Sequence, residues 1–131
     1  MVEFEKNTRK SFQKSERLSS HKHIQRLFSE GKSFSIHPFV VKYLNLKDQE
    51  LASHQVLISV SKRNFKRAVD RNRIKRQIRE AYRLNKHIIA DLPDKYAIAY
   101  IYTFKEKIPY KNLEDKLIEC LSRLKTELAS K

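Results

Sequence analysis

The sequence contains one cysteine, one glycine, three prolines and no tryptophan in 131 residues. The single cysteine, Cys120, excludes an internal disulfide and a metal site built from paired cysteines. Leucines surround it at helical spacing, at positions 113, 117, 121, 124 and 128. We therefore expect a buried thiol that takes no part in chemistry.

Long apolar runs are also absent. No run of about 18 apolar residues occurs. The first ten residues, MVEFEKNTRK, lack the apolar stretch of a signal peptide. We expect a cytoplasmic protein with no membrane partner.

Acidic residues are few. Asp and Glu number 15 against 29 Lys and Arg, which gives a formal net charge of +14. Such an excess attracts nucleic acid or an anionic membrane, and the lack of an apolar anchoring face disfavours the membrane. The length suits one domain with one small core, so residues 1–131 are interpreted as a single domain.

The first third of the chain is predicted to be an arm followed by a short helix. Residues 1–17 are mostly charged or polar, which is typical of an arm that is flexible unless it docks. Ser19 or Ser20 can cap the helix and Gly31, the only glycine, can end it. The apolar positions of this helix are Leu18, Ile24, Leu27 and Phe28.

The remaining periodicity predicts an α+β fold, a two-layer sandwich in the order helix-strand-strand-strand-helix-strand-helix. Alternation predicts strands at residues 39–46 and 96–104, and a continuously apolar run predicts a central strand at 55–60. Pro109 suits the first turn of a last helix at 110–129. The aromatic stripe on 96–104 is typical of a core face, although such rings can also stack on bases.

The most basic stretch is residues 61–83, SKRNFKRAVDRNRIKRQIREAYR. From Lys62 to Arg83 it contains ten Lys or Arg and two acidic residues. From about Val69 onward, a helical wheel separates apolar and basic residues onto opposite faces. The apolar face holds Ile74, Ile78, Ala81, Tyr82, Ile88 and Ile89, and the basic face holds Arg73, Lys75, Arg76, Arg79, Arg83 and Lys86.

This basic face is unfavourable in an isolated helix. A solvated face usually mixes signs so that i,i+4 neighbours attract, whereas pairs such as Arg76/Arg79 are like-charged. Five such pairs, at roughly 0.2–0.5 kcal/mol each, cost about 1–2.5 kcal/mol, of which Glu80 relieves part. A polyanion lying along the face explains the pattern better than solvation, and the excess of Arg favours bidentate phosphate contacts.

The same stretch resembles the protein subunit of bacterial ribonuclease P. The resemblance rests on Ser61-Lys62-Arg63 and on Arg71-Asn72-Arg73 followed by Lys75-Arg76 and Arg79, and it extends more loosely from Arg17 to Leu128. It implies that the chain binds the catalytic RNA of that endoribonuclease and the 5′ leader of precursor tRNA, and that it has no small-molecule substrate. The residues expected to contact RNA are Lys62, Arg63, Arg67, Arg71, Asn72, Arg73, Lys75, Arg76 and Arg79.

The resemblance also implies a left-handed βαβ crossover, opposite to the usual hand, and a cleft for the leader between the first helix and the exposed face of the sheet. Phe28 matches an aromatic position of the family. Ile24 stands where many members carry a second aromatic residue, and Lys42 where many carry tyrosine. The candidates for the cleft are Ile24, Phe28, Phe39, Lys42 and Tyr43.

The sequence offers little for catalysis. Its five histidines, at positions 21, 23, 37, 54 and 87, could supply acid–base groups, and His21 and His23 could hold a metal. However, two such rings on a helix point about 200° apart, and no carboxylate cluster accompanies any histidine. We predict no catalytic residue and no metal or cofactor bound by the protein. The resemblance implies that the active site and its Mg²⁺ belong to the RNA.

Three other functions remain open. A structural or ribosomal RNA-binding protein would share the charge and the fold type, but it would not improve cleavage of precursor tRNA. A DNA-binding protein would place the basic helix in a major groove, but a bZIP protein needs heptads after its basic region, whereas this helix has the apolar face of one packed on a sheet. A histidine nuclease would cleave without added RNA.

Overall fold

The computed structural model describes Phe12 and residues 14–47 and 51–129. The elements follow the predicted order. They are the 3-10 turn η1 (Lys14–Glu16), α2 (His21–Glu30), β1 (Lys32–Ile36), β2 (Phe39–Asn45), β3 (Gln55–Val60), α3 (Ala68–Asn85), the 3-10 turn η2 (Lys86–Ile89), β4 (Tyr96–Tyr102) and α4 (Tyr110–Ala129). In the described ranges, no helix combines the length and apolar character needed to cross a membrane.

The four strands form one sheet in the order β1-β2-β4-β3. Strand β2 runs antiparallel to β1 and β4, while β3 and β4 are parallel and are joined through α3. The βαβ crossover is therefore as predicted, and its hand stays a prediction. The central position predicted for residues 55–60 is wrong, because β3 pairs with β4 alone among the strands and forms an edge. Its apolar residues are explained by packing on both faces, Val56 and Val60 on one and Leu57 on the other.

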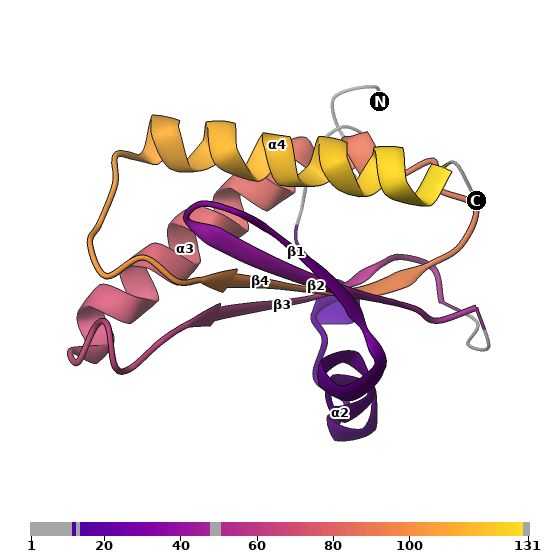
Figure 1. Cartoon of the computed structure of the whole chain (residues 1–131), viewed down its shortest axis with the longest axis horizontal. Coiled ribbons are helices and arrows are strands. Elements are labelled where there is room, and N and C mark those ends of the chain that lie inside the picture. Colours follow the sequence, from indigo (N-terminus) through magenta and orange to yellow (C-terminus); the bar gives the residue numbers. More distant parts are fainter. Residues whose placement is uncertain (1–11, 13, 48–50, 130–131) are drawn as a thin grey trace.

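Helices cover the two faces of the sheet unequally. Figure 1 shows α4 above the strands and α2 below them, and α3 lies on the same side as α4. The larger core lies between the sheet and the α3–α4 pair, and it includes the buried stripe Tyr96, Ile98, Tyr100 and Tyr102 of β4. As predicted, this stripe is core and so is Cys120, whose pKa burial raises to about 12.

Helix α2 begins after Ser20 and ends before Gly31, as predicted. Glycine is needed at position 31 because of close packing, which the sequence alone did not indicate. The Ser20 hydroxyl accepts a hydrogen bond from the His23 N–H at 3.3 Å, which caps the helix. Gly31 follows Glu30 with φ −69°, an ordinary angle. A Cβ there would lie 2.4 Å from the carbonyl oxygen of Leu27 and 3.0 Å from that of Tyr43. The missing side chain therefore lets α2 lie tightly against β2.

The end of the predicted N-terminal arm is docked. Residues 1–11 and 13 lie outside the described residues. The Phe12 ring meets Tyr82 of α3 edge-on, with centroids 5.8 Å apart, and the buried Glu16 carboxylate pairs with Lys86 at 2.7 Å. Arg17 then forms a parallel β-bridge with Val56 at the edge of the sheet.

Candidate RNA interface

The loop between β3 and α3 is anchored by its own backbone and by one apolar side chain. Phe65 is buried against Tyr102, and its N–H donates to the carbonyl of Ser61 at 3.1 Å. The Asn64 amide donates to the carbonyl of Thr103 at 3.1 Å. The four cations of this loop are exposed, namely Lys62, Arg63, Lys66 and Arg67.

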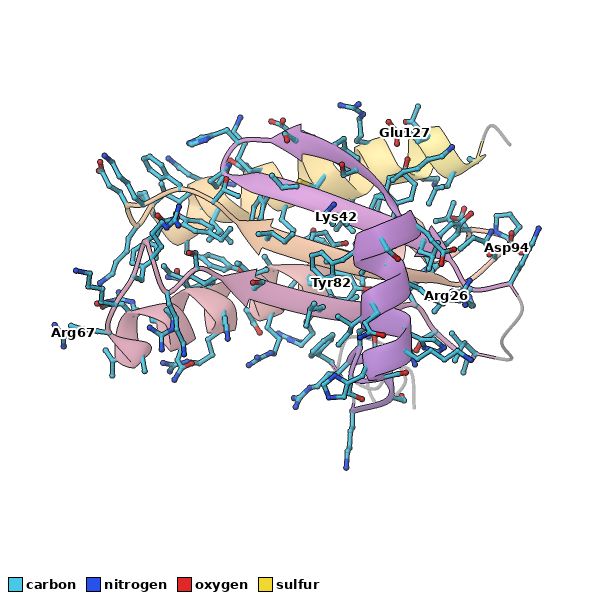
Figure 2. All side chains as sticks on the ribbon, turned by 60° about the horizontal axis from the view of Figure 1, so that its bottom comes forward. Arg26, Lys42, Arg67, Tyr82, Asp94 and Glu127 are labelled. Carbon is cyan, nitrogen blue, oxygen red and sulfur yellow. The ribbon has the colours of Figure 1, made fainter. Side chains whose placement is uncertain are left out.

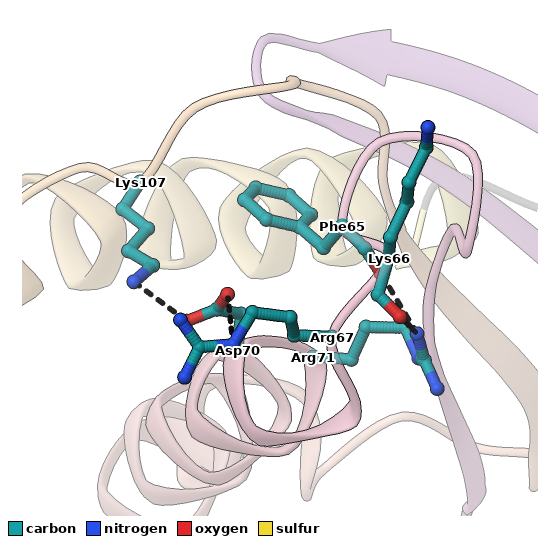
Figure 3. A network of polar contacts seen from close by, with 6 residues as sticks. All are labelled: Phe65, Lys66, Arg67, Asp70, Arg71 and Lys107. Atoms are coloured by element: carbon teal, nitrogen blue, oxygen red, sulfur yellow. Dashed lines mark hydrogen bonds and ion pairs between the residues drawn. The ribbon is translucent and has the colours of Figure 1, made fainter.

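Arg71 holds this loop against the start of α3. Its guanidinium Nη1 donates to the carbonyls of Phe65 at 2.8 Å and Lys66 at 2.9 Å (Figure 3). Beside it, the Asp70 carboxylate accepts a hydrogen bond from Lys107 at 2.8 Å and lies 4.0 Å from the Arg67 guanidinium. Arg71 therefore positions the loop cations, a role that the basic pattern alone did not predict, and its own contact with RNA stays a prediction.

The two predicted faces are present on α3, and their last residues, Lys86, Ile88 and Ile89, lie in the turn η2 that follows it. The apolar residues are buried, except that Ile88 is half-buried. Two cations at the end of the basic face are neutralised, Arg83 by two hydrogen bonds to Glu80 and Lys86 by Glu16. The cations nearer the start of α3 are not neutralised in this way. No carboxylate of the described chain forms an ion pair with Arg73, Lys75, Arg76 or Arg79. The uncompensated charge therefore lies on Lys62, Arg63 and Lys66 of the loop and on the first two-thirds of α3, where Asn72 is also exposed.

An open groove of about 490 Å³ runs beside this face. Arg73 and Arg76 line it together with Gln77, Glu80 and Tyr110. Two guanidiniums can bind phosphate, while the Gln77 amide and the Tyr110 ring can contact a base. Gln77 follows Arg73 by one helical turn, so helical spacing in the sequence could have identified it as a neighbour of Arg73 on the same side of α3. Tyr110 could not be identified in this way, because its place depends on how α4 docks.

A second candidate surface lies on the α2 side of the sheet. We call it the α2-side surface and define it by Phe28, Val40, Lys42 and Ile101. The Phe28 side chain is 44% exposed, and the Lys42 ammonium lies 5.7 Å from the centre of its ring. Figure 2 looks onto this side, with Lys42 next to α2. Val40 and Ile101 are paired across β2 and β4 and are partly exposed.

Of the other three candidates for the leader cleft, Ile24 lies on α2 one turn before Phe28, and Phe39 and Tyr43 lie on the opposite face of the sheet. Ile24 is half-buried and packs with Leu27 beneath α2. Phe39 and Tyr43 do not belong to the α2-side surface, because neighbouring strand residues point to opposite faces and Lys42 already faces α2. Both are buried in the larger core, and the Tyr43 hydroxyl donates to Glu127 of α4 at 2.6 Å. Burial and this carboxylate raise the pKa of Tyr43 to about 12. The same alternation could have identified Val40, which sequence reasoning missed.

Comparison with known proteins agrees with this architecture. The family model for ribonuclease P matches residues 12–125. The chain belongs to the ribonuclease P family. It is 40% identical over 115 residues to the ribonuclease P protein component of Porphyromonas gingivalis strain W83. The aligned region covers 85% of this chain and 84% of that protein. The fold is similar to that of ribonuclease P protein from Thermotoga maritima, with a TM-score of 0.68 and 28% identity over 82% of this chain and 96% of that one. The structure of the ribonuclease P protein from Staphylococcus aureus is also similar, with a TM-score of 0.69 and 28% identity over 84% of this chain and 95% of that one.

The histidines of this ribonuclease P family member are not gathered into a site. Within the described ranges, no three His, Cys, Asp or Glu side chains come together in a way that could hold a metal ion. His54 is buried and structural. Its Nδ1 accepts from the Tyr96 N–H at 3.0 Å, which leaves Nε2 to donate to the Ile89 carbonyl at 2.9 Å. The ring thus joins η2 to β4 in its neutral form, and burial lowers its pKa.

His54 makes the stability of the fold depend on pH. Burial disfavours the charged ring, and protonation of Nδ1 would also break the bond to Tyr96, so the folded-state pKa lies below the ordinary value of about 6.5. The stabilising contribution is complete above about pH 6.5 and is lost as the pH falls from there through the folded-state pKa. We expect the free energy of unfolding, measured by urea denaturation, to fall over this range. His54→Gln keeps one donor and one acceptor without titrating, and it should flatten the dependence. An unchanged slope in that variant would assign the effect to other groups.

Proposed function

We propose that this chain is the protein subunit of ribonuclease P and promotes 5′ maturation of tRNA by binding both the catalytic RNA and the 5′ leader of precursor tRNA. The observation that carries the proposal is a set of exposed or half-buried cations that lack carboxylate partners in the described chain, namely Lys62, Arg63, Lys66, Arg73, Lys75, Arg76 and Arg79. RNA phosphates would neutralise these charges and release counterions, which favours binding.

The two surfaces suit different RNA segments. The loop and α3 offer fixed guanidiniums, which suit the closely spaced phosphates of a folded RNA. The α2-side surface offers an exposed Phe28 ring, the Lys42 ammonium above it and the apolar Val40 and Ile101 beside it. Unpaired nucleotides stack on such rings while a cation holds their backbone. We assign the first surface to the catalytic RNA and the second to the leader, and because they lie on opposite sides of the sheet, one protein can hold both.

In this mechanism the protein supplies binding and positioning. The catalytic RNA supplies the reactive centre and its Mg²⁺. Arg71 fixes the loop on which Lys62 and Arg63 are carried, and Phe28 and Lys42 hold the leader in line with the cleavage site. No side chain of the protein transfers a proton or holds a metal, and no other cofactor is required.

The test of this function is reconstitution. Single-turnover cleavage of a leader-bearing precursor tRNA is measured with the catalytic RNA alone, the protein alone and both together, at low Mg²⁺. We expect both together to cleave much faster than the RNA alone, and the protein alone to be inactive. Replacing the four other histidines, at positions 21, 23, 37 and 87, by Gln should leave this stimulation intact, with His54 kept for its structural role. Cleavage by the protein alone, or no stimulation of the RNA, would refute the function.

The assignment of the leader is tested with two substrates, one that carries the leader and one cut back to a single leader nucleotide. Phe28→Ala and Lys42→Ala should each weaken binding of the first substrate by about 1–3 kcal/mol, the range for losing a stacked base or a charged contact. Binding of the second should be unaffected. Lys32→Ala is the matched control, because Lys32 is an exposed lysine on the neighbouring strand β1. An equal loss with both substrates would place the leader elsewhere.

A further inference from the structure

The segment from Phe12 to Leu18, which contains the 3-10 turn η1, is fixed to the end of α3, to η2 and to the edge of the sheet. Phe12 lies on Tyr82, Glu16 pairs with Lys86, and the Leu18 N–H donates to the carbonyl of Val56 at 2.9 Å. These contacts tie the segment both to α3 and to the edge of the sheet. Arg17, between Glu16 and Leu18, is therefore held beside the basic face even though it lies far from α3 in the sequence.

Arg17 adds a third guanidinium to the charges of Arg76 and Arg79. It is exposed, and its Cζ lies 5.5 Å from the centre of the Phe12 ring, the same ring that contacts Tyr82 of α3. Burial, followed by the charges of Arg17 and Arg76, lowers the pKa of the Arg79 guanidinium. Tyr82, which the Phe12 ring contacts, follows Arg79 by about one helical turn, so the Arg17 guanidinium beside Phe12 lies near Arg79, and its effect on the pKa of Arg79 agrees with this placement.

Among the residues that the structure describes, the cluster has no counterion. Glu16 is the carboxylate next to Arg17 in sequence, and it is engaged by Lys86. In the described part of the chain, neither Arg17, Arg76 nor Arg79 forms an ion pair. The Nε atom of Arg79 is buried and has no hydrogen-bond acceptor among the described residues. A buried donor on a cation is costly to leave unpaired, and an anion that reached it would also relieve the repulsion.

We propose that Arg17, Arg76 and Arg79 form one binding site for a phosphodiester group of RNA. The proposal rests on the proposed function, and it extends the RNA-binding surface from α3 to the N-terminal segment. The guanidiniums supply a planar set of donors that matches the oxygens of a phosphate. The phosphate can come from the catalytic RNA or from the precursor tRNA, and the same chemistry would recognise either one.

The test compares Arg17→Ala with Lys14→Ala in equilibrium binding. Lys14 is the matched control, because it is an exposed cation in the same turn and the same charge is lost. Each variant is titrated with the catalytic RNA and, separately, with leader-bearing precursor tRNA, at several salt concentrations. We expect Arg17→Ala to weaken binding of one of these RNAs about tenfold or more, as for loss of a charged hydrogen bond. The slope of log K against log[salt] should fall by about 0.7–0.9. Lys14→Ala should change affinity less than about twofold.

A double-mutant cycle tests whether the arginines share one phosphate. If they do, the loss caused by Arg17→Ala and Arg79→Ala together should be clearly smaller than the product of the two single losses. Arg17→Gln, which keeps the aliphatic part of the side chain and removes its charge, replaces Arg17→Ala if the alanine variant has a lowered thermal midpoint. Equal losses for Lys14→Ala and Arg17→Ala, or multiplicative losses in the cycle, would overturn the shared site. The proposed function would survive that outcome as long as the wild-type protein still stimulates cleavage.

Discussion

Replacing Arg63, Arg73 and Arg76 together by Ala is expected to weaken binding of the catalytic RNA by several kcal/mol, taking about 1–3 kcal/mol for each charge-assisted contact. All three side chains are exposed, and none forms an ion pair within the described chain. Their loss therefore removes contacts with RNA without breaking contacts in the fold. The measurement is the equilibrium dissociation constant of the protein–RNA complex at fixed salt, with single-turnover cleavage as a second readout, in which higher Mg²⁺ should restore part of the rate.

The control removes three charges elsewhere. Lys22, Lys32 and Lys105 are also exposed, so their replacement by Ala changes the net charge equally. Arg71 is kept in both proteins because it holds the loop carbonyls. We expect the control protein to bind far more tightly than the arginine variant. If the two bind equally weakly, total charge rather than the α3 surface determines affinity, and our assignment of the surface is wrong.

The second large effect concerns stability. Ile78 is fully buried in the centre of α3, so Ile78→Ala should lower the free energy of unfolding by roughly 2–5 kcal/mol through lost burial and the cavity that remains. Arg79, the next residue, is half-buried beside other cations and forms no ion pair in the described chain, so Arg79→Ala should change stability by less than about 1 kcal/mol. Chemical denaturation of the two variants separates these outcomes. If Arg79→Ala lowered the free energy of unfolding more than Ile78→Ala, the assignment of the face of α3 that packs in the core would be wrong.

The elements that the sequence predicted well are those with a long, regular pattern. The apolar face of α3 and the leucines of α4 repeat at helical spacing, and their burial follows from that spacing alone. The cap at Ser20 and the stripe on β4 are likewise local signals. Strand β1 had no predicted range, because it is short and among its five residues only Phe34 is buried.

The features that escaped prediction depend on contacts between distant segments. Glu16 neutralises Lys86 across 70 residues, so which cations on α3 stay uncompensated could not be read from α3 itself. The hydrogen bonds of Arg71 depend on the path of a loop, and the edge position of β3 depends on which strands pair. The misplacement of Phe39 and Tyr43 is different, since strand alternation beside Lys42 already indicated the opposite face.

The bridge between Arg17 and Val56 also affects how copies of this chain behave toward one another. Strand β3 has an apolar sequence, and one of its edges pairs with none of the other strands of the described chain. Such an edge can pair with a strand of another molecule and start aggregation. The bridge and the hydrogen bond from Leu18 occupy part of that edge at Val56. The turn that positions Arg17 therefore also limits self-association through β3.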